Sequence, residues 1–141
     1  MLNQDHHGLI FKEELPAIED YWDLFQTTGW NEKYEFSIDE LSKAIKNSWY
    51  SISLYDSGKL IGFGRVIADG VNHALIVDLI IHPKHQRRGL GSKLLDKLVM
   101  RCKENNIRDI QLFAARNKYG FYEKFGFEKR PENAPGMQLK Y

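Results

Sequence analysis

The 141-residue sequence has little cysteine, little proline and almost no net charge: one Cys, four Pro and a formal charge of +1. Cys102 cannot form a disulfide within the chain, which excludes a disulfide-stabilised secreted domain. No apolar run approaches the roughly twenty residues of a membrane span. A near-neutral charge also gives no general affinity for nucleic acid. We therefore expect neither a membrane nor a nucleic-acid partner.

The rest of the composition is that of an ordinary globular domain, with 43% hydrophobic and 28% charged residues. A chain of this length buries one core, so residues 1–141 are predicted to form a single domain. Residues 1–14 lack the cation-then-apolar order of a signal peptide. We therefore expect a cytoplasmic protein.

Residues 77–100 contain the most informative pattern of the chain. Val77, Leu79, Ile80 and Ile81 are typical of a buried strand, and Pro83 ends it because proline has no N–H for a ladder. Beyond the following loop, apolar residues recur at spacings of three and four. They predict an amphipathic helix of about fifteen residues that begins near Gly89 and carries Leu90, Leu94, Leu95, Leu98, Val99 and Cys102 on one face.

The junction between this strand and this helix favours anions. The first turn of a helix has unpartnered N–H groups and a partial positive charge, and Gly89 and Gly91 have no Cβ to hold a phosphate away. Cations surround the same place, namely Lys84, Arg87, Arg88 and Lys93. The glycine spacing matches neither a P-loop nor a dinucleotide-binding loop. The alternative is a simple tight turn beside solvated cations.

Two segments resemble motifs of the GCN5-related N-acetyltransferase (GNAT) family. Gln86, Gly89 and Gly91 fill the pattern Gln/Arg-x-x-Gly-x-Gly/Ala of its acyl-CoA pyrophosphate loop. Residues 120–127, GFYEKFGF, resemble its Leu/Phe-Tyr-x-x-x-Gly-Phe pattern, with Tyr122 at the tyrosine. The resemblance extends from about Trp49 to the end of the sequence. It implies acetyl-CoA as the acyl-donor co-substrate, and it is silent on the acceptor.

The resemblance also implies a fold: a mixed α/β (α+β) architecture in which about four helices flank a mostly antiparallel sheet. Its cleft for acyl-CoA opens where two parallel strands splay apart. Local patterns predict strands or hairpins at 8–13, 49–67, 71–81, 109–114, from 127 and at 137–140, helices at 16–28, 37–47, 89–104 and 118–125, and a loop at 30–34. The 37–47 helix is predicted from a capping box of Ser37 and Glu40.

The family's cofactor contacts are carried over position by position. The resemblance implies that Leu79, Ile80 and Ile81 offer backbone groups to pantetheine. It implies that the pyrophosphate is held by Gln86, Arg87, Arg88, Gly89, Leu90, Gly91 and Ser92. Many members have Asn and Ala seven and four residues before the tyrosine, where this chain has Ala115 and Lys118, and Asn117 is the substitute nearby. His82 and His85 have metal-like spacing without further ligands, so no metal is expected.

Acyl transfer from a thioester needs a neutral amine, a steadied carbonyl oxygen and an acid for the departing thiolate. A phenol suits the acid role because its reference pKa of about 10 keeps it protonated at neutral pH. Tyr122 stands where family members often carry that acid. The alternative is that Tyr119, Tyr122 and Phe125, spaced by three, form one packed aromatic face.

Asp78 is the carboxylate inside the predicted central strand. It is the candidate to accept a proton from the substrate or to bind a cationic substrate. The alternative is a structural pair with Arg65 or another cation. His73 is a weaker candidate, acting through a water, because a histidine just after a turn is usually exposed.

The sequence thus predicts an acetyl-CoA-dependent N-acetyltransferase in which a primary amine of a small molecule or peptide attacks the thioester directly. No cysteine or serine motif points to a covalent enzyme intermediate. The alternative function is a non-catalytic acyl-CoA-binding sensor or interaction module. Family members are commonly dimers, so we also expect a homodimer, although no pattern in the sequence marks a dimer interface.

Overall fold

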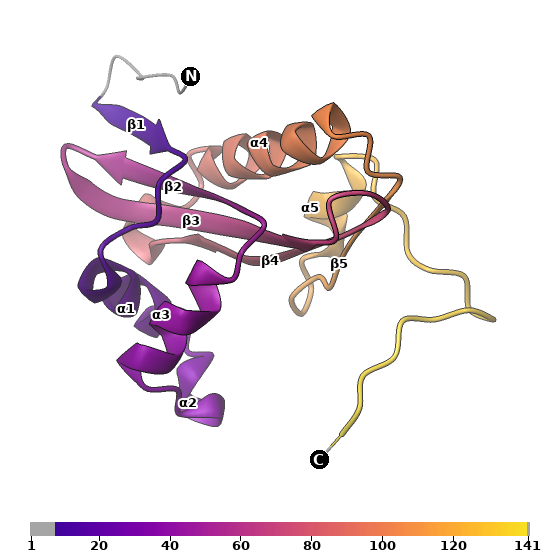
Figure 1. Cartoon of the computed structure of the whole chain (residues 1–141), viewed down its shortest axis with the longest axis horizontal. Helices are drawn as coiled ribbons and strands as arrows, with labels where there is room; N and C mark the ends of the chain where they lie inside the picture. Colours follow the sequence, from indigo (N-terminus) through magenta and orange to yellow (C-terminus); the bar gives the residue numbers. More distant parts are fainter. Residues whose placement is uncertain (1–7, 141) are drawn as a thin grey trace.

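The computed structural model describes residues 8–140. Its five strands form one sheet in chain order: β1 (Leu9–Lys12), β2 (Tyr50–Asp56), β3 (Lys59–Ala68), β4 (His73–Ile81) and β5 (Asp109–Leu112). The first four pair antiparallel with their neighbours, and β5 runs parallel to β4. The predicted mixed, mostly antiparallel sheet is confirmed (Figure 1).

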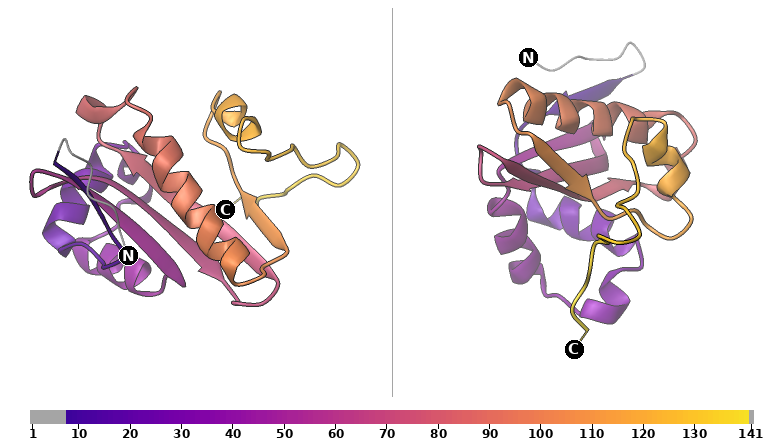
Figure 2. Two further views of the ribbon diagram at one scale, coloured as in Figure 1. Left: turned by 90° about the horizontal axis from the view of Figure 1, so that it is seen from above. Right: turned by 90° about the vertical axis from the view of Figure 1, so that its right-hand side faces the viewer.

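Helices cover both faces of this sheet. One face carries α1 (Ile18–Gln26), α2 (Asn31–Tyr34) and α3 (Ile38–Lys46), and the other carries the long α4 (Leu90–Glu104), as Figures 1 and 2 show. A one-turn 3-10 helix η1 (Pro83–His85) follows β4, and α5 (Tyr119–Glu123) lies beyond β5. Two apolar clusters result, one between sheet and α4 and one between sheet, α1 and α3. No helix in residues 8–140 is long and apolar enough to cross a membrane.

Two glycines of β3 set how closely α4 approaches the sheet. A Cβ on Gly64 would lie 2.8 Å from Leu98 Cδ1, and a Cβ on Gly62 would lie 3.0 Å from Leu94 Cδ1. Leu94 and Leu98 are fully buried. The glycines therefore admit the leucine face of α4 against the strand, which brings the N-terminus of α4 close to the end of β4.

A local sequence signal accounts for the start of α3. The predicted capping box is present: Ser37 Oγ accepts from the Glu40 N–H at 3.1 Å, and Glu40 accepts from the Ser37 N–H at 2.9 Å. The predicted loop at 30–34 is wrong, because residues 31–34 form α2. Asn31 closes this short turn through two hydrogen bonds between its side chain and the backbone of Phe36.

The C-terminal predictions are partly wrong. The strand predicted at 109–114 ends at Leu112, and no strand begins at Phe127 or covers residues 137–140. These segments have strand-like alternation, but within residues 8–140 no neighbouring strand pairs with them. Residues 1–7, the first half of the segment 1–14 that lacks the order of a signal peptide, lie outside the described residues.

Candidate functional site

The site begins where β4 extends beyond the end of its parallel neighbour, β5. The last residue pair between the two strands is Ile76 with Leu112, whereas β4 continues to Ile81. From residue 77 onward, β4 has a strand partner only on its β3 side among the described residues. Leu79 and Ile80 therefore lie on the part of β4 whose edge away from β3 has no strand partner among the described residues. Their contact with pantetheine stays a prediction. The carbonyl of Ile81 already accepts the side-chain amide of Gln86 at 3.0 Å.

A bulge distorts β4 at the same level. The pairing with β3 shifts between Phe63 and Arg65, and Asp78 has a left-handed backbone with φ of 53°. Arg65 holds this bulge: its Nε donates to Asp78 Oδ2 at 2.7 Å, and its Nη1 donates to the Ala44 carbonyl of α3 at 3.1 Å. Arg65 is 9% exposed. The structural pairing that the sequence left open for Asp78 is thus present.

The pairing leaves part of the Asp78 carboxylate available. Arg65 uses only Oδ2, and no described residue hydrogen-bonds Oδ1. The Asp78 side chain is 24% exposed. Tyr21 of α1 lies close enough for the Asp78 charge to raise the pKa of its hydroxyl further, in addition to the larger effect of burial. Nothing in the sequence pattern of the helix predicted at 16–28 indicates that the Tyr21 hydroxyl lies near Asp78.

The loop after β4 leads into the N-terminus of α4, whose first-turn backbone N–H groups have no hydrogen-bond partner among the described residues. Gly89 adopts φ of 73° and is the N-cap of α4, and no side chain caps this end. In the described part of the chain, the first-turn N–H groups of Leu90, Gly91 and Ser92 have no partner, whereas Lys93 N–H bonds the Gly89 carbonyl at 3.3 Å. No atom lies within 4 Å of where a Gly89 Cβ would be. The loop can therefore hold an anion against three amides.

The predicted cations of the loop are not equivalent. Arg88 lies 2.8 Å from His85 Nδ1 and 3.8 Å from Asp56, so it braces the loop against the β2–β3 turn. Arg87 is exposed and, among described residues, has no polar partner; its backbone is left-handed, with φ of 64°. Arg87 therefore remains available to an anion, while Gln86 and Arg88 shape the loop.

Tyr122 lies on α5, next to this loop. The ring of Phe121 is 5.1 Å from the Tyr122 ring and approaches Gly91, where an added Cβ would meet Phe121 Cζ at 3.7 Å. Tyr122 is half-buried, and burial raises the pKa of its hydroxyl. No described residue hydrogen-bonds that hydroxyl. The hydroxyl therefore stays protonated at neutral pH and is not committed to another group.

The contacts of Tyr122 can be compared with the alternative that Tyr119, Tyr122 and Phe125 form one packed aromatic face. Tyr122 packs against Phe121 and Phe127, not against Tyr119. Tyr119 is 48% exposed and lies under the Lys129 ammonium, which is 4.0 Å from its ring centroid. Tyr122 and Phe125 thus both pack against the core cluster, as the aromatic alternative has it, whereas Tyr119 lies outside that cluster.

Other candidates lie elsewhere. Asn117 occupies an exposed turn with φ of 61° and has no polar partner among the described residues. His73 lies at the opposite end of β4, 2.9 Å from Asp109, and is exposed. His82 accepts the Lys84 N–H as the cap of η1. Residues 8–140 hold no group of three His, Cys, Asp or Glu side chains arranged for a metal.

Comparison with known proteins agrees with this geometry. The Acetyltransferase (GNAT) family matches residues 15–127. The chain is 35% identical over 118 residues to an uncharacterized N-acetyltransferase, ycf52, of Pyropia yezoensis, covering 81% of this chain and 66% of that protein. It is 32% identical over 125 residues to the histone acetyltransferase TAP1 of Glycine max, covering 81% of this chain and 53% of that protein.

A solved structure gives the same result. A probable acetyltransferase from meticillin-resistant Staphylococcus aureus superposes with a TM-score of 0.80 at 28% identity, covering 94% of this chain and 99% of that one. The fold and the comparisons therefore define a domain of the GNAT type. The chain belongs to the GNAT acetyltransferase family. It spans about half to two thirds of the length of the curated relatives it matches.

Proposed function

We propose that the protein is an acetyl-CoA-dependent N-acetyltransferase that transfers the acetyl group to a primary amine of a small molecule or peptide. The observation that carries the proposal is the pairing of two open backbone features. The uncapped N-terminus of α4 offers three amides, and the unpaired edge of β4 runs up to it. An anionic head followed by a chain of amides, as in acyl-CoA, needs these two features in this order.

The residues present fit acetyl-CoA. The amides of Leu90, Gly91 and Ser92, with Arg87 beside them, would hold the pyrophosphate. Leu79 and Ile80 would offer backbone groups to the pantetheine arm. When bound, acetyl-CoA supplies the acetyl group as a thioester. Gln86 contributes indirectly, since its side chain ties the loop to the end of β4.

The chain's own residues supply the proton transfers. As the amine nitrogen bonds to the acetyl carbon, the carbon–sulfur bond breaks and the sulfur needs a proton. The uncommitted Tyr122 hydroxyl is the donor in this proposal, and burial favours its protonated form. The attacking nitrogen becomes cationic when it bonds to the acetyl carbon, and the proton that it then loses restores the Tyr122 hydroxyl. The proposal is supported by Phe121, the neighbour of Tyr122, whose ring approaches Gly91 in the first turn of α4.

Asp78 is the proposed partner of the amine. Its free Oδ1 lies at the bulge in β4, on the unpaired part of the strand, and Arg65 fixes the orientation of the carboxylate. A carboxylate held in this way attracts a protonated amine and accepts its proton before attack. The name of the Glycine max relative mentions histones, which carry primary amines on lysine side chains.

A panel of amines tests the proposal. Purified protein, acetyl-CoA and single amines (arylalkylamines, polyamines, amino acids and lysine peptides) are incubated, and release of free CoA thiol is measured. We expect at least one amine to raise thiol release above the rate with acetyl-CoA alone, with a matching N-acetyl product by mass spectrometry. If acetyl-CoA binds and every amine fails, the protein is a non-catalytic acyl-CoA sensor.

A further inference from the structure

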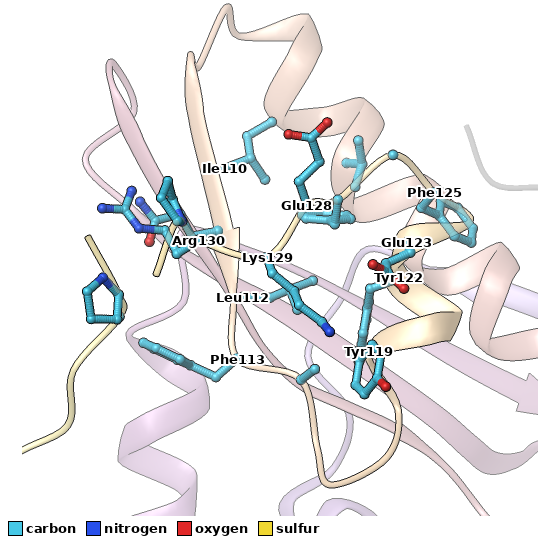
Figure 3. Close-up of a pocket in the computed structure, with 18 of the residues that line it drawn as sticks. Ile110, Leu112, Phe113, Tyr119, Tyr122, Glu123, Phe125, Glu128, Lys129 and Arg130 are labelled. Atoms are coloured by element: carbon cyan, nitrogen blue, oxygen red, sulfur yellow. The ribbon is translucent and has the colours of Figure 1, made fainter. Parts of the chain in front are cut away.

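A cavity of about 310 Å³, hereafter the β2 cavity, lies beside the start of β2. Glu13 and Leu15 line one side, the chain from the end of α3 into β2 lines another, and Arg101 of α4 completes it. None of its lining residues belongs to β4, to the cofactor loop (residues 86–92) or to α5. It is therefore distinct from the larger groove of about 710 Å³ beside β5, which Tyr122 lines, as Figure 3 shows.

The β2 cavity exists because β1 is shorter than β2. Lys12, the last residue of β1, pairs with Ser53, so residues 50–52 of β2 have a strand partner only on the β3 side among the described residues. The chain leaves the sheet at Glu13, and Ser53 Oγ donates to the Glu14 carbonyl at 3.1 Å, which holds this segment against β2. The walls of the cavity are thus fixed by backbone pairing and by a hydrogen bond, as in a preformed ligand pocket.

Ser51 gives the β2 cavity an unused polar group. Ser51 is 6% exposed, and its hydroxyl makes no hydrogen bond with a described residue. In residues 8–140 no side-chain nitrogen or oxygen is both fully enclosed and unpartnered, so the exposed part of Ser51 includes its hydroxyl oxygen. Ser48 differs, since its hydroxyl donates to the Ile45 carbonyl at 2.7 Å and accepts from Arg65 Nη1 at 3.4 Å. The nearly buried Ser51 hydroxyl therefore gains most from a polar ligand in the cavity.

The charges around the β2 cavity favour a singly charged anion. Glu13 accepts a hydrogen bond from the Tyr50 hydroxyl at 2.8 Å and pairs with Arg101, whose guanidinium lies 4.4 Å from the Tyr50 ring centroid. Lys46 is exposed and has no ion-pair partner among the described residues. The lining therefore carries one positive charge that is not balanced, while the nearby Glu13 carboxylate disfavours an anion of higher charge.

Apolar side chains provide the rest of the lining. Ile45 is buried, Trp49 is half-buried and Leu15 is 40% exposed. We propose that the β2 cavity binds a small carboxylate with one negative charge and a short apolar or aromatic body. The carboxylate pairs with Lys46 and accepts a hydrogen bond from the Ser51 hydroxyl, and the body lies against Leu15 and Trp49. The cavity volume is at the lower end of the range for small-molecule sites, so the ligand is small.

Titration of 3-phenylpropionate into the full-length ¹⁵N-labelled chain, followed by NMR, provides the first test. We expect saturable binding with a Kd of about 1 mM or tighter, with shifts of the Trp49 indole and Ser51 amide signals. The uncharged 3-phenylpropionamide should bind about tenfold more weakly or worse, because it cannot pair with Lys46. Equal binding of the amide overturns the proposal, as does the absence of saturation. Shifts confined to residues 89–92 place the anion at the cofactor loop and also overturn it.

Two variants identify the groups that hold the carboxylate. Lys46→Met should raise the Kd for 3-phenylpropionate about tenfold, whereas Lys43→Met, in the same last turn of α3 but outside the cavity, should not change it. Ser51→Ala should raise the Kd several-fold and leave the unfolding midpoint near wild type, because the Ser51 hydroxyl has no hydrogen bond within residues 8–140 to lose. Wild-type affinity of Lys46→Met overturns the proposal. Neither test depends on acetyl transfer.

Discussion

At the scale of single residues, Tyr122 carries the proposed chemistry. Its hydroxyl is protonated at neutral pH because burial raises its pKa, and it makes no hydrogen bond that deletion would disrupt. Tyr122→Phe should therefore keep the fold and the affinity for acetyl-CoA. The rate of acetyl transfer in a single turnover should fall roughly ten- to ten-thousand-fold, the range for losing a general acid.

Single-turnover measurement matters because slow product release would hide a chemical defect in kcat. Tyr119→Phe is the matched control, since the exposed Tyr119 ring lies under Lys129 and its hydroxyl has no assigned role. A Tyr122→Phe enzyme with the wild-type single-turnover rate across pH would remove Tyr122 from the catalytic residues.

Asp78→Asn separates the two roles of the other candidate. Asparagine still offers an oxygen to Arg65 Nε, so the bulge and the contact from Arg65 to α3 persist. The negative charge toward the amine is lost. We expect kcat/KM for the amine to fall by about tenfold or more while the affinity for acetyl-CoA and the unfolding midpoint stay near wild type. Equal kcat/KM would leave Asp78 with the structural role alone.

At the scale of elements, β3 and α4 fit because two positions have no side chain. Gly64→Ala places a Cβ 2.8 Å from Leu98 Cδ1 and 3.2 Å from Leu79 Cδ1, so buried side chains must move. We expect the free energy of unfolding to drop by about 1–3 kcal/mol, the usual cost of overpacking. The measurement is urea denaturation. Gly120→Ala in α5 is the control, because nothing lies within 4 Å of its added Cβ.

The turn between β3 and β4 should contribute to stability in a pH-dependent way. Asp69 accepts the N–H groups of Val71, Asn72 and His73, and these bonds lower the pKa of its carboxyl below 3.8. A depressed folded pKa means that the stabilisation is fully present above pH 3.8 and is lost as pH falls below it. Asp69→Ala should therefore lower the Tm clearly at pH 7 and less at about pH 2.5. An undiminished difference at low pH would contradict this.

Much of the element order follows from local rules in the sequence. The capping box before α3, the glycine at the start of α4 and the proline after β4 act within a few residues, so the pattern locates these boundaries. The strands predicted from Phe127 and at 137–140 failed for the opposite reason. A strand exists only when another strand pairs with it, and alternation in one segment does not reveal the partner.

At the scale of the whole molecule, the candidate site joins parts far apart in the sequence. The loop at residues 86–92, between β4 and α4, could be predicted from the sequence because its glycines and cations lie close together along the chain. The sequence did not predict that Arg65 of β3 donates hydrogen bonds both to Asp78 of β4 and to the Ala44 carbonyl of α3, or that Phe121 contacts the start of α4. Tertiary packing produces these contacts, and only the pairing of Asp78 with Arg65 was among the alternatives that the sequence raised.

The most direct test of the account is a calorimetric titration of acetyl-CoA into wild-type protein and Gly91→Glu. An added Cβ has room, since it meets only Phe121 and Ile81, at 3.7 and 3.8 Å, and a carboxylate in the first turn of α4 favours the helix. The fold should therefore be kept or stabilised, while repulsion of the pyrophosphate raises the Kd about tenfold or more.

Lys103→Glu is the charge control, because Lys103 is an exposed residue in the last turn of α4, at the end opposite the cofactor loop. Lys103→Glu should bind acetyl-CoA within about twofold of wild type. The account predicts weak binding by Gly91→Glu alone, with its Tm unchanged or higher. Equal affinity of all three proteins for acetyl-CoA would contradict the placement of the cofactor at the start of α4.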